Sequence, residues 1–388
     1  MLDTPVRTAD HESQLYGNRA AATPVFGAMN PPEPVKDPLS ALDDFLGGSA
    51  FDSSDPLALG TMLAQLVERG YDRLPLPGSG RTLLRWRALA AVAACDLGLV
   101  KLFEGHTDAL AILAELQEPV AQEPSLNTAS RWGVWAAEAP DARLVATRAD
   151  RDRDDASGGG VLLLNGTKAW CSGARVLSHA LVTAWLDDQP VLAAVELKQP
   201  SISISIEPWH AVGMRATQSG DVHFDATPAR AVGASHAYVE RAGFWQGGAG
   251  IAACWYGAAA GIAQMMAAAM AARADAHRLA HLGAVDVALA GAAAVLRESA
   301  AQIDANPAAD HQLTALRARL AVEAAATEVM HHAGRALGAA PLCRNPRFAR
   351  AMADLPVFLR QSHAERDLAA LGEMVRTRHR DDSSAWAL

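Results

Sequence analysis

The middle of the chain is interpreted from one segment, Asn165-Gly166-Thr167-Lys168-Ala169-Trp170-Cys171-Ser172-Gly173-Ala174. An apolar run precedes it at residues 161–164, and an Asn-Gly pair tolerates the positive φ angles of a type I′ turn. The segment therefore predicts a β-hairpin that turns at Asn165-Gly166. Residues 201–206 alternate strictly between Ser and Ile, as a half-buried strand does. Together with further short apolar runs, these patterns predict a β-domain over residues 127–240.

The segments on either side of this β-domain have the periodicity of helices. Leu99, Phe103, His106 and Leu110 follow the spacing of one apolar helix stripe, which makes His106 a core residue in this interpretation. Beyond residue 241, four long helical segments joined by short loops predict a bundle, at about residues 250–274, 281–305, 311–337 and 347–371. The predicted organisation is a flexible N-terminal arm, a helical domain, the β-domain and the bundle, at residues 1–50, 51–126, 127–240 and 241–388.

The composition argues against several classes of protein. The net charge is −9, and the basic residues are scattered rather than gathered into the stripe that a nucleic-acid partner requires. The four cysteines lie far apart without metal-ligand spacing, so neither a disulfide framework nor a metal site is expected, and the protein is expected in the cytoplasm. Glycines and Gln264 interrupt the alanine-rich stretch at residues 248–272, which favours a buried bundle helix over a membrane span.

Three local sequences, taken in order, resemble those of the acyl-CoA dehydrogenase family. The segment at residues 165–174 resembles the family's NG-x-K-x-W motif, and residues 213–224 resemble its G-x-R-x-[TS] segment. The sequence Phe103-Glu104-Gly105-His106 is similar to its substrate-cavity helix. This resemblance, over roughly residues 90–372, implies an α+β fold with an N-terminal helical domain, a central β-barrel and a C-terminal four-helix bundle. It also implies a homodimer or homotetramer.

The same resemblance implies a flavin, FAD or alternatively FMN, between barrel and bundle. Trp170 offers a flat face to an isoalloxazine ring, and Ser172 offers a hydroxyl and a backbone N–H to its polar edge. The alternative is that Trp170 is a core aromatic at a strand end. Trp135 and Ala137 stand in the place of the family's flavin-binding loop, although Ala137 replaces its threonine.

Two further residues are cofactor candidates by position. Arg273 aligns with an arginine that reaches the FAD pyrophosphate of a neighbouring subunit, and an arginine can direct two donors at phosphate oxygens. It could equally be an ordinary surface arginine. Ser362 stands where the family's threonine touches FAD.

The family's catalytic base is missing from both of its usual positions. Arg360 stands at the usual glutamate, and an arginine is always protonated and accepts no proton. The second family position falls near Ile251, where no acid is present. Nearby candidates are His363, Glu365 and Asp367, of which His363 and Asp367 are spaced i, i+4 and could pair. The alternative is a solvated helix end with capping side chains.

These observations leave three functions open. The first is an FAD-dependent oxidoreductase that acts on an acyl-CoA or related small acyl molecule, with Glu104 and Arg360 at the substrate and an electron-transfer flavoprotein as acceptor. The second is a monooxygenase of the same fold, since a histidine in place of the glutamate resembles the dibenzothiophene monooxygenase branch, which takes reduced flavin from a reductase. The third is a paralogue that binds flavin or acyl chains without turnover.

Overall fold

The structure, a computed structural model, describes residues 39–116, 130–149, 160–271 and 274–381, together with Trp386. All of these belong to one compact unit that begins at Leu39. Most of the predicted N-terminal arm therefore lies outside the described residues. Its last part forms helix α1 (Ser40–Gly48), which buries Leu42 and Leu46.

Three further helices form the N-terminal region. They are α2 (Pro56–Glu68), α3 (Thr82–Cys95) and α4 (Leu97–Glu115). Asp96 separates α3 from α4, because it is extended and its carboxylate caps α4 by accepting the N–H of Leu99 at 2.9 Å. His106 on α4 is buried between Asp72 and the backbone N–H of Trp132. The structure thus confirms His106 as a satisfied core histidine.

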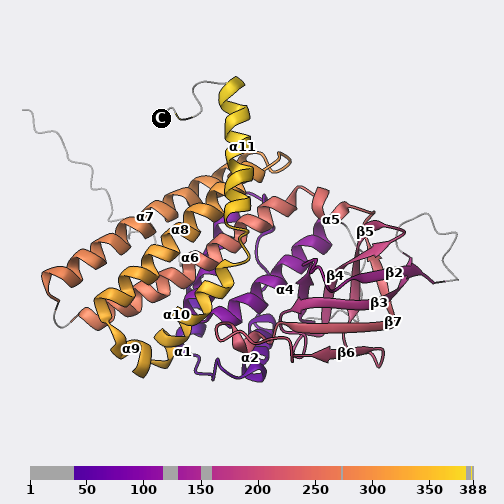
Figure 1. Cartoon of the computed structure of the whole chain (residues 1–388), viewed down its shortest axis with the longest axis horizontal. Coiled ribbons are helices and arrows are strands. Elements are labelled where there is room, and N and C mark those ends of the chain that lie inside the picture. Colours follow the sequence, from indigo (N-terminus) through magenta and orange to yellow (C-terminus); the bar gives the residue numbers. More distant parts are fainter. Residues whose placement is uncertain (1–38, 117–129, 150–159, 272–273, 382–385, 387–388) are drawn as a thin grey trace, which may run out of the picture. The chain divides into compact units, whose positions relative to one another are not determined.

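The central region is a closed β-structure. In the described part of the chain, seven strands form one sheet, namely β1 (Trp132–Trp135), β2 (Leu144–Arg148), β3 (Val161–Cys171), β4 (His179–Leu186), β5 (Gln189–Glu196), β6 (Ile202–Ser205) and β7 (Gly220–Val232). Strand β4 pairs with β5 along one edge and with β1 and β2 along the other. Because β5 also pairs with β7, β7 with β3, and β3 with β2, the sheet closes on itself (Figure 1). The predicted α+β fold with a central barrel is confirmed.

The hairpin predicted at Asn165-Gly166 is wrong. Strand β3 runs through this pair. One edge of β3 pairs with β7 both before and after Asn165-Gly166, and the other edge pairs with β2 over residues 162–166. The irregularity is a bulge between Leu164 and Gly166. Gly166 has φ 113°, and a Cβ added there would overlap the carbonyl oxygen of Arg143. The glycine is needed for a bulge and a close approach of two backbones rather than for a turn.

A tight hairpin does occur elsewhere in the barrel. Leu186 pairs with Gln189 across the β4–β5 connection. The two residues between them, Asp187 and Asp188, have φ values of 51° and 58°. Positive φ at both central residues defines the type I′ turn, and aspartate tolerates this conformation.

The C-terminal region is helical, as predicted, but its last segment is not continuous. Helices α6 (Gly243–Met270), α7 (Ala276–Ala305) and α8 (Gln312–Leu337) pack together, with α10 (Pro346–Leu359) against α6 and α11 (Glu365–Asp381) against α8. The predicted single helix at residues 347–371 is wrong, because the chain breaks at residues 360–364. Ser362 accepts the N–H of Ala364, and Asp367 accepts the N–H of His363. Ala364 itself has φ 47°. These capping bonds start a new helix.

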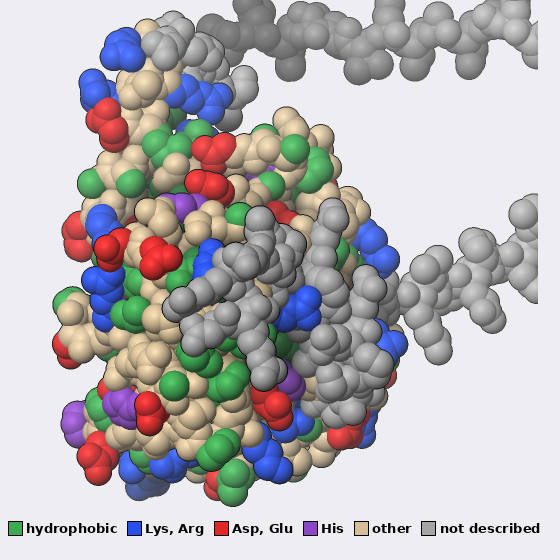
Figure 2. Space-filling model, turned by 90° about the vertical axis from the view of Figure 1, so that its right-hand side faces the viewer, with side chains coloured by type: hydrophobic (Ala, Val, Ile, Leu, Met, Phe, Trp, Pro, Cys, Tyr) green, Lys and Arg blue, Asp and Glu red, His purple; other side chains and the backbone are tan. Residues whose placement is uncertain are grey.

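Helix α4 lies between the barrel and the C-terminal helices, since it contacts β1 of the barrel as well as α6, and it also contacts α3 (Figure 1). Two short helices, α5 (Ala237–Glu240) and α9 (Ala339–Arg344), complete the set. Among the described residues, two helices are long and apolar enough to cross a membrane by length and composition, α6 with 61% of its apolar window buried and α7 with 22%. Figure 2 shows acidic and basic side chains intermixed over one face of the molecule.

Candidate active site

A cavity of about 690 Å³ brings most of the predicted site residues together. Its walls come from the barrel, from α4 and α6, and from the break between α10 and α11. A volume of this size is typical of ligand sites. Eight predicted residues line it, namely Glu104, Trp135, Ala137, Trp170, Ser172, Arg360, His363 and Asp367.

Three predicted site residues are not part of this lining. Arg273 lies outside the described residues. Ser362 is buried, and its hydroxyl oxygen accepts the N–H of Ala364 at 3.2 Å. Glu365 is exposed in the first turn of α11. Ser362 therefore caps the turn before α11, and Glu365 is an acidic residue at the start of that helix.

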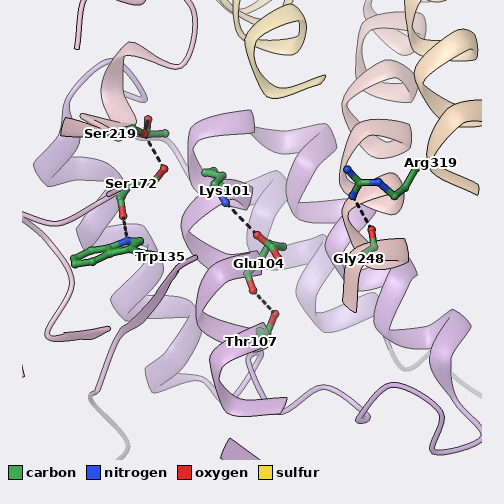
Figure 3. Close-up of polar contacts among 9 residues, drawn as sticks. Lys101, Glu104, Thr107, Trp135, Ser172, Ser219, Gly248 and Arg319 are labelled. Atoms are coloured by element: carbon green, nitrogen blue, oxygen red, sulfur yellow. Dashed lines mark hydrogen bonds and ion pairs between the residues drawn. The ribbon is translucent and has the colours of Figure 1, made fainter. Parts of the chain in front are cut away.

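The barrel contributes a chain of hydrogen bonds to the cavity wall. The indole N–H of Trp135 donates to the carbonyl oxygen of Ser172 at 3.3 Å (Figure 3). The hydroxyl oxygens of Ser172 and Ser219 are 2.7 Å apart, and those of Ser219 and Thr217 are 2.8 Å apart. Thr217 and Ser219 also line the cavity. They were not singled out from the sequence, although both lie within the motif at residues 213–224 that carries the resemblance.

The loop that holds Thr217 is anchored to α10. The carboxylate of Asp354 accepts the N–H of Met214 at 2.5 Å, and Met214 has φ 56°. Gly213 packs so tightly that a Cβ there would overlap the carbonyl oxygen of Ala353. Burial raises the pKa of Asp354 to about 6. A left-handed conformation at a residue such as Met214 persists only where its surroundings hold it.

Trp170 stands out because it is a large apolar side chain left uncovered. It is 57% exposed and lines the cavity. The register shift between Lys168 and Cys171 and a φ of 57° at Trp170 direct its indole away from the barrel core. It is therefore not a core aromatic. Its ring face is available to a planar ligand.

A buried ion pair joins the two barrel segments beside the cavity. Lys168 is 1% exposed, and its ammonium group lies 2.6 Å from the carboxylate of Glu138 and 2.7 Å from the hydroxyl of Thr183. The indole N–H of Trp185 donates to the other oxygen of Glu138 at 3.1 Å. Burial lowers the pKa of Lys168, which Glu138 opposes. The pair connects the segment of Ala137 to that of Trp170.

Helix α4 presents a charged face to the cavity. Lys101, Glu104 and Asp108 all line it, and the spacing i, i+3, i+7 places them on one side of the helix. The ammonium group of Lys101 lies 3.3 Å from a carboxylate oxygen of Glu104 (Figure 3). Burial raises the pKa of Glu104 even though Lys101 opposes this shift. Glu104 thus lies at a cavity, where the sequence resemblance had predicted it.

Arg319 on α8 reaches the cavity and was not predicted from the sequence. Its guanidinium donates to the carbonyl oxygen of Gly248 at 3.0 Å (Figure 3). It also donates to the carbonyl oxygen of Gln361 at 2.8 Å and lies 5.0 Å from the ring centre of Trp255. Burial lowers its pKa. No local motif indicates this role, because it depends on where α8 meets α6 and the helix break.

The break between α10 and α11 contributes Arg360, His363 and Asp367. Arg360 forms an ion pair with Glu323 of α8. The Nδ1 atom of His363 lies 3.5 Å from a carboxylate oxygen of Asp367, whose other oxygen accepts the N–H of His363 at 3.0 Å. Asp367 therefore does two things. One carboxylate oxygen lies beside the imidazole of His363, and the other caps the turn before α11. Within the described residues, no group of three or more His, Cys, Asp or Glu side chains could hold a metal ion.

Comparison with known proteins agrees with this architecture. Residues 137–227 match the family described as acyl-CoA dehydrogenase, middle domain. The fold is similar to that of KijD3 in complex with FMN and a dTDP-amino-keto sugar, with a TM-score of 0.70, 21% identity, and coverage of 86% of this chain and 91% of that one. It is also similar to TdsC from Paenibacillus sp. A11-2 with FMN and indole, with a TM-score of 0.67, 18% identity, and coverage of 86% and 92%.

A curated relative is similar in sequence. The dibenzothiophene monooxygenase of Rhodococcus erythropolis is 30% identical over 212 residues, which cover 50% of this chain and 48% of that protein. In this match the chain thus spans about half the length of the curated relative. Taken with the barrel and the bundle, these similarities show that the chain has the acyl-CoA dehydrogenase-like fold, with a middle segment that matches that family.

Proposed function

We propose that this chain is a flavin-dependent monooxygenase that takes reduced FMN from a partner reductase and oxygenates a small ring-containing molecule. The observation that carries the proposal is the ion pair of Arg360 with Glu323. It fixes a cation at the position of the dehydrogenase base, where α-proton removal requires an acceptor. The relative and the two structural neighbours supply the precedent, since one is a monooxygenase by name and both structures contain FMN.

The residues present fit a flavin ring. The uncovered face of Trp170 and the backbone at Ala137 border a cavity of about 690 Å³, which suits a planar tricyclic group. The hydroxyls of Ser172, Ser219 and Thr217 provide donors and acceptors for the polar edge of such a ring. FMN is proposed over FAD because both neighbours contain FMN.

The chemistry divides between the cofactor and the chain. Bound reduced flavin would supply the two electrons with which dioxygen yields one oxygen atom in the substrate and one in water. The imidazole of His363, whose Nδ1 lies 3.5 Å from a carboxylate oxygen of Asp367, is the proposed group that exchanges a proton at the site. Trp170 and the barrel hydroxyls bind and orient the ring, while the helices α4 and α6 enclose the substrate side.

The test compares flavins and reactions on the full chain. We expect FMN to bind more tightly than FAD, as measured by quenching of flavin fluorescence. We also expect oxygen consumption and oxygenated product with reductase-supplied flavin. Ser172→Ala should weaken FMN binding about tenfold, for the loss of one hydrogen bond to a ligand, whereas Ser203→Ala on the exposed face of β6 should not.

Three results would contradict the proposal in different ways. Anaerobic bleaching of bound FAD by an acyl-CoA would restore the dehydrogenase hypothesis. Failure to bind flavin in either redox state would support a non-catalytic paralogue. Binding of flavin with equal affinity in the Ser172→Ala variant would show that the ring lies elsewhere.

The protein partner, the cellular location and the oligomeric state are proposed as well. A flavin reductase is the proposed protein partner, and the cytoplasm is the proposed location. A homodimer or homotetramer is proposed through the bundle. Helix α7 is consistent with this, because it is apolar yet only 22% of its apolar window is buried, and Leu279 and Val287 are exposed on it.

A further inference from the structure

The substrate side of the cavity is more polar than an apolar substrate requires. Figure 3 shows Lys101 and Glu104 of α4 between the barrel residues and Arg319. Asp108 lies one helical turn beyond Glu104 and lines the same cavity. Charged groups in a site that excludes water cost free energy unless hydrogen bonds replace the lost water.

Most of these charges already have protein partners. Lys101 lies 3.3 Å from Glu104. Arg241, whose side chain is 4% exposed, donates to Glu115 at 2.9 Å. Asp108 is different, because no hydrogen bond or ion pair reaches its carboxylate from any residue in the described part of the chain. Its acceptor oxygens are therefore free for a ligand.

The position of Asp108 is well defined. A Cβ added at Gly247 of α6 would lie 2.8 Å from one of its carboxylate oxygens, so the carboxylate lies directly over the α6 backbone. Burial first, and the negative charge of Asp108 second, raise the pKa of Tyr238. Asp108 and Tyr238 are therefore neighbours in the cavity wall.

Aromatic side chains line the same cavity as this carboxylate. Tyr238 and Phe244 meet edge to face at 5.5 Å, and Phe244 and Trp245 meet in the same way at 5.3 Å. All three line the cavity. The guanidinium of Arg241 lies 5.5 Å from the ring centre of Tyr238, and its buried Nε has no hydrogen-bond partner among the described residues. A flat apolar ring can pack against this wall, while a polar substituent faces charged groups.

We infer that the substrate is a small ring compound that packs against Phe244 and Trp245 and donates a hydrogen bond from a hydroxyl or amino group to Asp108. The inference rests on the proposed function and narrows its substrate class. An unsubstituted arene, or dibenzothiophene itself, has no such donor. It would strip water from Asp108 and Glu104 and replace none of their hydrogen bonds. A site of this kind rejects an analogue that lacks the donor by at least about tenfold.

The test uses equilibrium binding without flavin, oxygen or turnover. Four probes with the same ring system are compared by calorimetry or by quenching of tryptophan fluorescence, namely naphthalene, 2-naphthol, 2-naphthylamine and 2-methoxynaphthalene. The wild-type chain is expected to bind 2-naphthol or 2-naphthylamine at least about tenfold more tightly than 2-methoxynaphthalene. Asp108→Leu should bring this ratio to about one, and Asp108→Asn should reduce it because its oxygen accepts without a charge. Asp286→Asn on the exposed side of α7 should keep the wild-type ratio.

The outcomes separate this inference from the proposed function. Equal affinity for the donor and the methoxy probes, a ratio that survives in both Asp108 variants, or no binding of any ring probe each overturns it. Flavin binding and oxygen consumption are measured independently. If the chain binds FMN but does not prefer the donor probes over 2-methoxynaphthalene, the inference about Asp108 is wrong and the proposed function stands. If Asp108→Leu does not fold, Asp108→Asn carries the comparison alone.

Discussion

Glu138 is expected to be necessary for stability, because it is the only charged partner of a buried lysine in the described structure. The change is Glu138→Gln, which keeps the side-chain shape and removes the charge. Lys168 is 1% exposed, whereas Glu138 is 44% exposed. The variant leaves an uncompensated cation in the core with only neutral acceptors close to it, the new amide oxygen and the hydroxyl of Thr183. Breaking one side of a buried pair costs about 3–5 kcal/mol. Because Glu138 is partly exposed, solvent weakens the native ion pair. We therefore expect Glu138→Gln to lower the free energy of unfolding by about 3 kcal/mol, the lower end of this range.

The assay is urea unfolding at pH 7, followed by circular dichroism and tryptophan fluorescence. The matched control is Glu196→Gln at the exposed end of β5, which should change the free energy of unfolding by less than about 0.5 kcal/mol. The double variant Glu138→Gln/Lys168→Met replaces the pair by an amide and an apolar chain. It should recover most of the free energy of unfolding that Glu138→Gln loses, because the buried charge is gone.

The pH dependence follows from the lowered pKa of Lys168. The folded state favours the neutral amine, and the unfolded state keeps its ordinary, higher pKa. Folding therefore releases a proton between the two values, so the stability of the Glu138→Gln variant rises with pH across that window. The deficit relative to wild type should shrink from pH 7 toward pH 10. A Glu138→Gln variant as stable as wild type, or a double variant no better than the single one, would refute the reasoning.

Three further predictions concern other parts of the chain. Asp354→Asn keeps an acceptor for the N–H of Met214. Burial raises the pKa of Asp354 to about 6, so the folded state of the wild type loses stability as the pH rises through that value. The variant should therefore be more stable than wild type at pH 7.5 but not at pH 4, as measured by thermal unfolding. Arg360→Glu should not create acyl-CoA oxidation, measured by anaerobic bleaching, because the new carboxylate would face Glu323; bleaching would restore the dehydrogenase hypothesis. Val287→Asp on α7 should shift the chain toward monomer in light scattering, and an unchanged mass would place any association elsewhere.

Local patterns in the sequence were enough for the order of helical, β and helical regions. Helix capping is encoded locally, as at Asp96, whose carboxylate accepts an N–H three residues away. The resemblance also predicted cavity positions for Trp170 and Ser172, which lie close together in one motif. The approach of His363 to Asp367 agrees with the i, i+4 spacing, although His363 lies in the break before α11 rather than on a helix.

The tertiary structure decided everything that depends on distant partners. Asn165-Gly166 has the composition of a turn, but pairing of β3 with β2 and β7 on both edges keeps the strand continuous. The role of Arg319 arises where α8 meets α6 and the helix break. The free carboxylate of Asp108 is visible only once its neighbours are known. A short window of sequence encodes caps, turns and periodicity, whereas strand partners and the satisfaction of a buried charge are set by residues far along the chain.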